Sequence, residues 1–281
     1  MSYTTLVDAA TVHAHLEDPA WVIVDCRHAL ADFSLGRKLY EEGHLPGAFF
    51  AAVESDLAGR HTGTNGRHPL PDPETFAAFL REMGVTDATQ IVAYDAGGDM
   101  FAARLWFLCR WIGHDAVAVL DGGIAAWNAA GFPLSANAPV ARTRGTIAAR
   151  VRSELVVDAA FVLAHLGKRD VTIVDARAAD RFAGQNETID PVAGHIPGAH
   201  NHPFKSIFNA DLRFKNPDDL AAAYAAHGAP SQIVHQCGSG VSAAANMLAM
   251  EYAGMRGSRL YAGSWSEWIA DPKRPIAVGS D

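Results

Sequence analysis

The chain has 281 residues, of which 49% are hydrophobic and 19% are charged, and its formal net charge is −8. This composition is typical of a globular protein and excludes a disordered or fibrous one, and the length is sufficient for two domains with separate cores. The acidic balance argues against nucleic acid as a partner.

Short apolar runs without strict alternation predict parallel strands that are covered on both faces. In the first half, we expect strands at residues 22–25, 91–94 and 117–120. We expect helices of this half at residues 76–83, 100–112 and 124–130. In the second half, the same reasoning predicts strands at residues 172–175, 233–235 and 259–261 and helices at 220–227 and 242–252.

The two halves share sequence motifs in the same order. Asp-Cys-Arg at 25–27 returns as Asp-Ala-Arg at 175–177. Gly-His-Leu-Pro-Gly-Ala at 43–48 returns as Gly-His-Ile-Pro-Gly-Ala at 194–199, about 150 positions later. Because each copy contains several strands and helices, the repeat indicates a duplicated domain rather than a solenoid.

The predicted fold is therefore α/β, with two tandem domains that each contain a mostly parallel sheet with helices on both faces. We place the first domain at residues 1–135 and the second at residues 153–281. The segment 136–152 is poor in large apolar residues, which is typical of a linker.

The run Val-His-Gln-Cys-Gly-Ser-Gly-Val-Ser at 234–242 places Cys237 between the end of a predicted strand and the start of a predicted helix. Two glycines allow this loop to curl, so that its N–H groups point at one sulfur. Amides beside a helix N-terminus stabilise negative charge, which favours the reactive thiolate. Cys237 is the candidate nucleophile, and the residues expected to hold the substrate around it are Gly238, Gly240, Val241 and Ser242.

The other two cysteines, Cys26 and Cys109, lie in apolar surroundings and are expected to be structural. Three cysteines in unrelated contexts do not indicate a disulfide framework, so we expect a cytoplasmic protein. Residues 1–15 lack the pattern of a secretory signal, and we expect no membrane partner. The histidines lack cysteine or carboxylate partners at ligand spacing, so we expect no metal.

These features resemble the rhodanese family of sulfurtransferases in its tandem two-domain form. The resemblance rests on the Gly-His-Leu/Ile-Pro-Gly-Ala motif of both halves, the loop that starts at Cys237, and Gly-Ser-Trp-Ser-Glu-Trp at 263–268. It implies that the second domain is catalytic and the first is inactive. Asp95 stands at the nucleophile position of the first half, and a carboxylate there cannot carry sulfur.

The resemblance also implies a two-step reaction without a cofactor. Cys237 would take a sulfur from a small anionic donor, 3-mercaptopyruvate or thiosulfate, and hold it as a persulfide. A thiol, cyanide or a thioredoxin-like protein would then accept the sulfur.

The preferred donor stays open at this point. The loop Cys-Gly-Ser-Gly-Val-Ser contains no Lys or Arg and is similar to the loop of mercaptopyruvate-preferring members, Cys-Gly-Ser-Gly-Val-Thr. Arg181 matches the family arginine that binds the anionic end of the donor. A second arginine usually follows it in mercaptopyruvate enzymes, but residues 186–191 contain no basic side chain here, so thiosulfate remains an alternative.

Several other side chains are candidates for the site. Ser239 could hydrogen-bond a donor carbonyl or assist proton transfer, and His44 could move a proton to the departing pyruvate. Ser242 could be either a helix N-cap or a catalytic group. The glycine-rich loop at 59–71 carries Arg60 and Arg67, either of which could reach the substrate.

Arg177 follows Asp175 at the end of a predicted strand, and the same pair stands at 25 and 27 in the first half. We therefore expect a structural ion pair rather than a substrate contact.

Two other functions fit a cysteine loop. A cysteine-loop phosphatase or arsenate reductase needs an arginine six residues after the cysteine, and this position is Ala243. A non-catalytic persulfide carrier would stop after one equivalent of donor, whereas an enzyme would continue.

Overall fold

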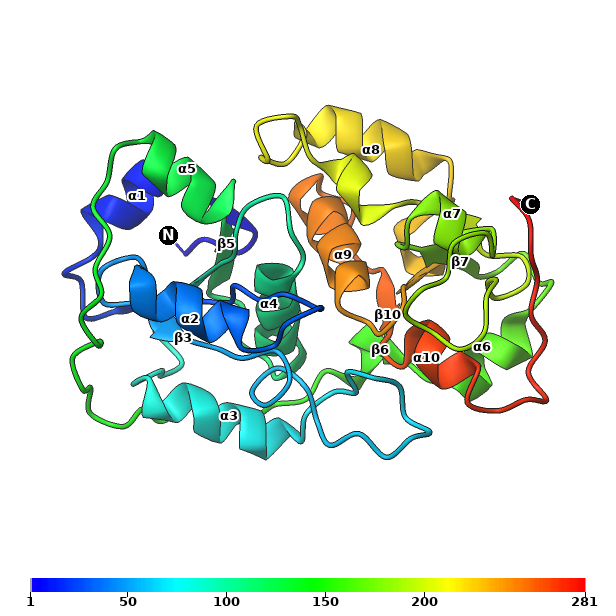
Figure 1. Cartoon of the computed structure of the whole chain (residues 1–281), viewed down its shortest axis with the longest axis horizontal. Coiled ribbons are helices and arrows are strands. Elements are labelled where there is room, and N and C mark those ends of the chain that lie inside the picture. Colours follow the sequence, from blue (N-terminus) through cyan, green and yellow to red (C-terminus); the bar gives the residue numbers. More distant parts are fainter. Residues whose placement is uncertain (1, 281) are drawn as a thin grey trace. The chain divides into compact units, whose positions relative to one another are not determined.

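The computed structural model describes residues 2–280, which form two compact units (Figure 1). Unit 1 comprises residues 2–59, 70–152 and 208–214, and unit 2 comprises residues 60–69, 153–207 and 215–280. Two short segments thus group with the unit that is built mainly from the other half of the sequence. The domain limits at 135 and 153 describe the sequence repeat and stay a prediction.

Unit 1 contains a five-stranded sheet in which every neighbouring pair of strands is parallel. In spatial order the strands are β1 (Leu6–Val7), β5 (Val117–Leu120), β4 (Gln90–Tyr94), β2 (Trp21–Asp25) and β3 (Phe49–Phe50). Every residue of β2 and β4 is buried, which explains why these strands are continuous apolar runs.

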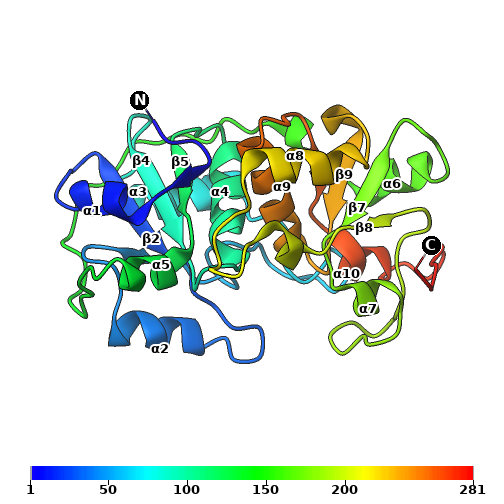
Figure 2. The same cartoon turned by 90° about the horizontal axis from the view of Figure 1, so that it is seen from above.

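Helices cover both faces of the unit 1 sheet. They are α1 (Ala9–Ala14), α2 (Leu35–Glu42), α3 (Pro73–Glu82), α4 (Phe101–Trp111) and α5 (Gly123–Ala129). Because side chains alternate across a strand, Ile23 and Val92 point to one face, where they pack with Val12 of α1 and Trp127 of α5. Helix α4 packs against β4 and β5 from the other side (Figure 2).

Unit 2 repeats this architecture with another parallel sheet of five strands. Its strands in spatial order are β6 (Val156–Val157), β10 (Arg259–Tyr261), β9 (Ile233–Gln236), β7 (Thr172–Asp175) and β8 (His200–Asn201). Its helices are α6 (Ala159–His165), α7 (Ala179–Phe182), α8 (Pro217–Ala225), α9 (Ser242–Tyr252) and α10 (Ser264–Trp268), with 3-10 turns at Ser153–Leu155, Phe204–Ile207 and Pro230–Gln232.

The core of unit 2 also has two sides. Ile173 and Val234 pack with Val162 of α6 and Trp268 of α10 in one apolar cluster. Helix α9 contacts β9 and β10, and α8 packs on α9. The predicted fold class, two tandem α/β domains with mostly parallel sheets, is confirmed.

The structure adds elements that the sequence did not predict. The edge strands β1, β3, β6 and β8 have two residues each, which is too short to show a periodic pattern. Neighbouring strands fix these segments through backbone hydrogen bonds, so tertiary context rather than local sequence determines them.

A buried ion pair lies at the end of β2 in unit 1 and at the end of β7 in unit 2, as predicted. Arg27 Nη2 lies 2.6 Å from Asp25 Oδ2 in unit 1, and Arg177 Nη2 lies 2.7 Å from Asp175 Oδ2 in unit 2. In unit 2 the same guanidinium donates to the carbonyl of Gly194 at 2.8 Å. The Asp-Arg pair therefore anchors the Gly-His-Ile-Pro-Gly motif to the strand, and the first unit does the same through the carbonyl of Gly43.

The helices of both units are short. Helices α4 and α9 have 11 residues each, whereas a bilayer span needs about 20 apolar residues. Among residues 2–280, no helix combines the length and the apolar character that crossing a membrane requires.

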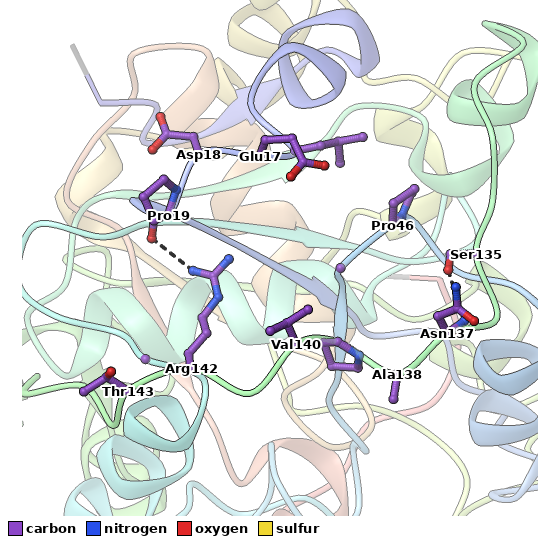
Figure 3. Close-up of a pocket in the computed structure, with 14 residues that line it drawn as sticks. Glu17, Asp18, Pro19, Pro46, Ser135, Asn137, Ala138, Val140, Arg142 and Thr143 are labelled. Atoms are coloured by element: carbon purple, nitrogen blue, oxygen red, sulfur yellow. Dashed lines mark hydrogen bonds between the residues drawn. The ribbon is translucent and has the colours of Figure 1, made fainter.

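Unit 1 also contains an open pocket of about 670 Å³ (Figure 3). Glu17 and Asp18 line one side of it, and Val140 and Arg142 line the other. Arg142 Nη1 donates to the carbonyl of Pro19 at 3.0 Å, which ties the segment after α5 to the start of β2. The residues that line this pocket include no cysteine and no histidine.

Candidate active site

Cys237 lies directly after β9, a central strand of unit 2, and α9 begins five residues later. The carboxyl ends of parallel strands are where α/β proteins bind ligands. The sequence therefore places the thiol at the edge of the sheet where a substrate is expected. Cys237 is 2% exposed, so the loop encloses the sulfur closely.

Hydrogen bonds from backbone N–H groups hold this loop on two sides. The Gly240 N–H donates to Cys237 Sγ at 3.1 Å, which is the direct amide contact to the sulfur. On the other side, the Cys237 N–H donates to Ser264 Oγ at 3.1 Å, and the Trp265 N–H donates to the Cys237 carbonyl at 3.0 Å. The turn that starts α10 thus fixes the position of Cys237.

Gly240 cannot be replaced without disturbing this arrangement. Its φ is +79°, a conformation that favours glycine. A Cβ at this position would lie 2.3 Å from the carbonyl oxygen of Ala262. Both observations explain why the loop has a glycine here.

Ser239 is the second polar group of the loop, and its partner is a histidine that the sequence did not single out. Ser239 Oγ lies 2.7 Å from His68 Nδ1, and both residues are buried within unit 2. His68 comes from segment 60–69, whose backbone packs tightly at Gly66 against the turn before α10. A Cβ on Gly66 would stand 2.7 Å from the Gly263 carbonyl oxygen, so only glycine allows this approach. The only sequence signal for His68 is its place after Gly-Arg in the glycine-rich stretch.

Arg181 lies beside the cysteine loop. Its Nη2 would stand 3.6 Å from a Cβ placed on Gly238, the residue after Cys237. Arg181 is held by two carboxylates: its Nη2 lies 2.9 Å from Glu187 Oε1 and 3.2 Å from Asp190 Oδ2. The side chains of these two acids are 2% exposed, so the ion pairs are shielded from water.

Glu187 also organises the loop between α7 and the Gly-His-Ile-Pro-Gly motif. Its Oε1 accepts the backbone N–H groups of Ile189 and Asp190 at 2.9 and 3.0 Å. In the sequence, this segment is notable only because it lacks an arginine. The acids gave no signal of their own, because no periodic pattern relates positions 181, 187 and 190 and because Arg67 is 123 positions away from Asp190.

Arg67 reaches the same place from segment 60–69. Its Nη1 forms an ion pair with Asp190, and its backbone N–H donates to Ser266 Oγ at 3.0 Å. Arg60, the other arginine considered from the sequence, is exposed at the start of the segment. Of the two, Arg67 is the one that the structure brings to the cysteine loop.

The remaining two residues of the loop form the start of α9. Val241 occupies the N-cap position of α9, and Ser242 is the first residue of the helix. The alternative that Ser242 is the N-cap is therefore wrong. Both side chains are buried next to the loop.

His44 belongs to unit 1, where both of its ring nitrogens face backbone carbonyls. Nδ1 lies 2.6 Å from the Tyr40 oxygen, and Nε2 lies 3.0 Å from the Asn137 oxygen. The residue is 1% exposed, and its ring stacks on Tyr40. These contacts favour a structural role in unit 1, and the proton transfer suggested for His44 stays a prediction that they do not support.

In unit 1, the loop that corresponds to the cysteine loop is closed. The Asp95 carboxylate accepts the N–H groups of Gly97 and Ala102, each at 3.0 Å, and the space around it measures about 10 Å³. Burial raises the pKa of Asp95, although these amides oppose the shift. Leu212, from segment 208–214, fills the space over Gly98. Asp95 thus stands where unit 2 has Cys237, and the space beside its carboxylate is small.

Within residues 2–280, no group of three or more His, Cys, Asp or Glu side chains is arranged to hold a metal ion.

Known proteins match the chain over nearly its full length. The family model described as "Rhodanese-like domain" matches residues 8–130 and 158–271. The chain is 45% identical to a protein of Pseudomonas aeruginosa named "Probable 3-mercaptopyruvate sulfurtransferase", with 99% of this chain and 100% of that protein covered. It is 36% identical to a "Putative thiosulfate sulfurtransferase" of Mycobacterium tuberculosis, with 92% and 91% covered.

Solved structures agree with this assignment. The crystal structure of SseA from Escherichia coli, a 3-mercaptopyruvate sulfotransferase with the rhodanese fold, matches with a TM-score of 0.81 and 34% identity. The match covers 94% of this chain and 99% of that one. The duplicated motifs, the two parallel sheets and these matches together establish that the chain belongs to the rhodanese family of sulfurtransferases.

Proposed function

We propose that this sulfurtransferase takes sulfur from 3-mercaptopyruvate and carries it as a persulfide on Cys237. The single observation that supports this best is the arrangement of the Cys237 loop, in which an amide contacts the sulfur and an arginine lies beside the next residue. All three cysteines have free, buried thiols, which is consistent with a reducing compartment. These thiols support a cytoplasmic location, which is part of the proposal.

In the first step, the Cys237 thiolate attacks the sulfur of the donor and forms an S–S bond. The carbon–sulfur bond of the donor breaks, and its electron pair leaves with the carbon as the enolate of pyruvate. A proton then converts the enolate to pyruvate. The loop amide at Gly240 N stabilises negative charge on the sulfur before and after the transfer.

The pair Ser239 and His68 supplies a route for that proton. Ser239 Oγ is two residues from the nucleophile and hydrogen-bonded to His68 Nδ1, so the hydroxyl can donate toward the enolate while the ring restores its proton. In the second step, an acceptor attacks the outer sulfur of the persulfide and releases the Cys237 thiolate. Cyanide, a small thiol and a thioredoxin-like dithiol all have the nucleophilic character that this step needs.

The choice of donor depends on charge. Thiosulfate is a dianion and 3-mercaptopyruvate a monoanion, and the loop from Gly238 to Ser242 contains no lysine or arginine. Arg181 is already paired with Glu187 and Asp190. These carboxylates partly cancel its positive charge, so the electrostatic attraction for the second negative charge of thiosulfate is weaker. The relative from Pseudomonas aeruginosa carries the mercaptopyruvate name, and this supports the same choice.

Side-by-side kinetics with the two donors, with cyanide as the acceptor, test the proposal. We expect kcat/KM for 3-mercaptopyruvate to exceed that for thiosulfate by at least about tenfold, since one charge-assisted interaction is worth that factor. Continuous release of pyruvate beyond one equivalent identifies an enzyme rather than a carrier. The reverse donor ratio would support the thiosulfate alternative, which the name of the Mycobacterium tuberculosis relative favours.

A phosphatase is not supported by the site. The position six residues after the cysteine is Ala243, which is fully buried in α9, and an arginine is needed there to hold a transferred oxyanion.

Ser239→Ala is expected to affect the two donors differently. Pyruvate leaves as an enolate that needs a proton, whereas sulfite leaves as a stable anion. We therefore expect kcat with 3-mercaptopyruvate to fall by about a hundredfold and kcat with thiosulfate to fall by less than about threefold. His68→Asn should show the same split. Ser206→Ala, at an exposed serine that bonds only its own turn, is the control, and an equal loss with both donors would mean that Ser239 is merely structural.

A further inference from the structure

Unit 2 contains four histidines that lie close together and that the proposed reaction does not use. They are His200 in β8, His202 directly after that strand, His227 shortly after α8, and His235 in β9. Tyr224 of α8 packs against them, with its ring centroid 4.3 Å from that of His202 and 6.1 Å from that of His235. We call the four residues the histidine cluster.

Both ring nitrogens of His227 face a ring nitrogen of another histidine. Its Nδ1 lies 3.2 Å from His200 Nδ1, and its Nε2 lies 3.1 Å from His202 Nδ1. These are hydrogen-bond distances, and each bond needs one proton between its two nitrogens. A neutral imidazole supplies one donor and one acceptor, so three neutral rings satisfy both bonds.

This chain of three rings has room for only one additional proton. If His227 becomes a cation, both of its nitrogens donate, so both neighbours must accept and stay neutral. If His227 stays neutral, it donates in one bond and accepts in the other. The neighbour that accepts from it must then be neutral, and only the neighbour that donates to it can be charged. A second proton would place two N–H groups against each other and break one of the bonds.

His235 is the fourth ring of the cluster, and its surroundings disfavour a charge. It is fully buried, and its Nε2 donates to Met250 Sδ of α9 at 3.1 Å. Its Nδ1 is also buried and has no hydrogen-bond partner among residues 2–280. Burial is the main cause that lowers the pKa of His235 to about 3, and the nearby His202 and His227 act in the same direction.

The charged groups that face the cluster are cations. Burial lowers the pKa of His202 to about 4, and the next causes are His227 and Lys215, the lysine shortly before α8. Burial and then His200 lower the pKa of His227. From α9, the cluster meets the neutral side chains of Met250 and Asn246. No aspartate or glutamate is among the causes for these histidines, so an added positive charge has no compensating partner.

The cluster joins elements that adjoin the cysteine loop. The His202 N–H donates to the Asp175 carbonyl at the end of β7, and the His202 carbonyl accepts Asn246 Nδ2 of α9 at 2.9 Å. Helix α8 packs on α9 (Figure 2). Since the Cys237 loop connects β9 to α9, the cluster fastens the end of α8 to both elements that flank this loop.

We propose that the histidine cluster is an acid-sensitive latch, which holds the end of α8 against β8, β9 and α9 while its rings carry at most one proton, and releases α8 when further protons bind. Free histidines accept protons below about pH 6.5. The open state therefore binds more protons than the closed state, so the latch is fully stable above this pH and loses stability as the pH falls below it. This inference goes beyond the proposed function, because it concerns the stability of unit 2 and involves no residue that the reaction uses.

Hydrogen exchange of the α8 amides tests the latch, with α4 of unit 1 as the reference in the same sample. Opening allows the chain of three rings to bind up to two further protons. Each of these raises the opening constant by about 30-fold between pH 7.5 and pH 5.0. We therefore expect the opening constant of α8 to rise by at least about a hundredfold relative to that of α4.

Two variants and a matched control connect this rise to the cluster. His202→Asn keeps a hydrogen-bonding group opposite His227 Nε2 but removes one ring, so the rise should be at least about tenfold smaller. His227→Gln removes the central ring, which lets both outer rings accept protons in the closed state, so most of the rise should disappear. His165→Gln, in α6 and outside the cluster, should keep the wild-type rise.

An equal rise in α4, or the full wild-type rise in His227→Gln, would refute the latch. Should a variant fail to fold, NMR titration of the histidine rings in wild-type protein decides the question. At most one ring among His200, His202 and His227 should take up a proton above about pH 5, and two rings that titrate near about pH 6.5 would overturn the proposal. None of these measurements needs a sulfur donor, so a protein that turns over neither donor refutes the proposed function alone.

Discussion

Replacing Cys237 by serine is expected to reduce sulfur transfer by a factor of at least about 10³, because a hydroxyl in the same loop is a far weaker nucleophile toward sulfur. Neither of the two residues that come closest to replacing Cys237 can take over its role. Ser239 is bonded to His68, and the position equivalent to Cys237 in unit 1 is Asp95. The measurement is continuous pyruvate release with cyanide as the acceptor.

Mass spectrometry provides the second readout of this variant. Wild-type protein incubated with donor should gain about 32 Da on the peptide that contains Cys237, and the serine variant should gain nothing. Cys109→Ala is the control, since Cys109 is fully buried in α4 and burial raises the pKa of its thiol well above the ordinary value. Sulfur found on Cys109, or full activity of Cys237→Ser, would contradict the assigned nucleophile.

Gly240→Ala is expected to have the second-largest effect, on both stability and activity. A residue with a Cβ at φ +79° costs about 1 to 2 kcal/mol. The added Cβ would stand 2.3 Å from the Ala262 carbonyl oxygen, and relieving such overpacking costs about another 1 to 3 kcal/mol. Relief requires the loop to move, which takes the Gly240 N–H away from the sulfur and should slow turnover by at least about tenfold.

The chain offers a matched control for this variant. Gly198 has φ +75° and no atom within 4 Å of its Cβ position, so Gly198→Ala carries the backbone cost without the clash. Urea unfolding of both variants isolates the difference. If Gly240→Ala were no less stable than Gly198→Ala and fully active, the loop would not be held against Ala262 as described.

The sequence was sufficient to predict the fold class and the position of the cysteine loop between a strand and a helix for a physical reason. A continuous apolar strand, a cysteine, two glycines and a helix are consecutive in the chain, so local rules apply to them. The ion pair of Asp175 and Arg177 was predictable for the same reason, because its two members are two residues apart.

The partners of the nucleophile could not be predicted in this way. His68 and Ser239 are 171 positions apart, and no periodicity or spacing connects them. In the sequence, the segment that contains Asp190 was notable only because it lacks an arginine. In the structure, Asp190 forms ion pairs with two arginines, Arg67 and Arg181. Contacts of this kind form only in the folded chain, and the local patterns of a single sequence do not show which distant residues will meet.

The presence of residues 60–69 in unit 2 has a consequence for each half of the sequence taken by itself. The first half has Asp95 where the second half has Cys237, yet it carries His68, whose ring contacts Ser239 of the cysteine loop. A segment of the first half thus contributes a side chain to the unit that is built mainly from the second half. A gene that encoded residues 153–281 alone would produce a cysteine loop in which Ser239 lacks its histidine partner.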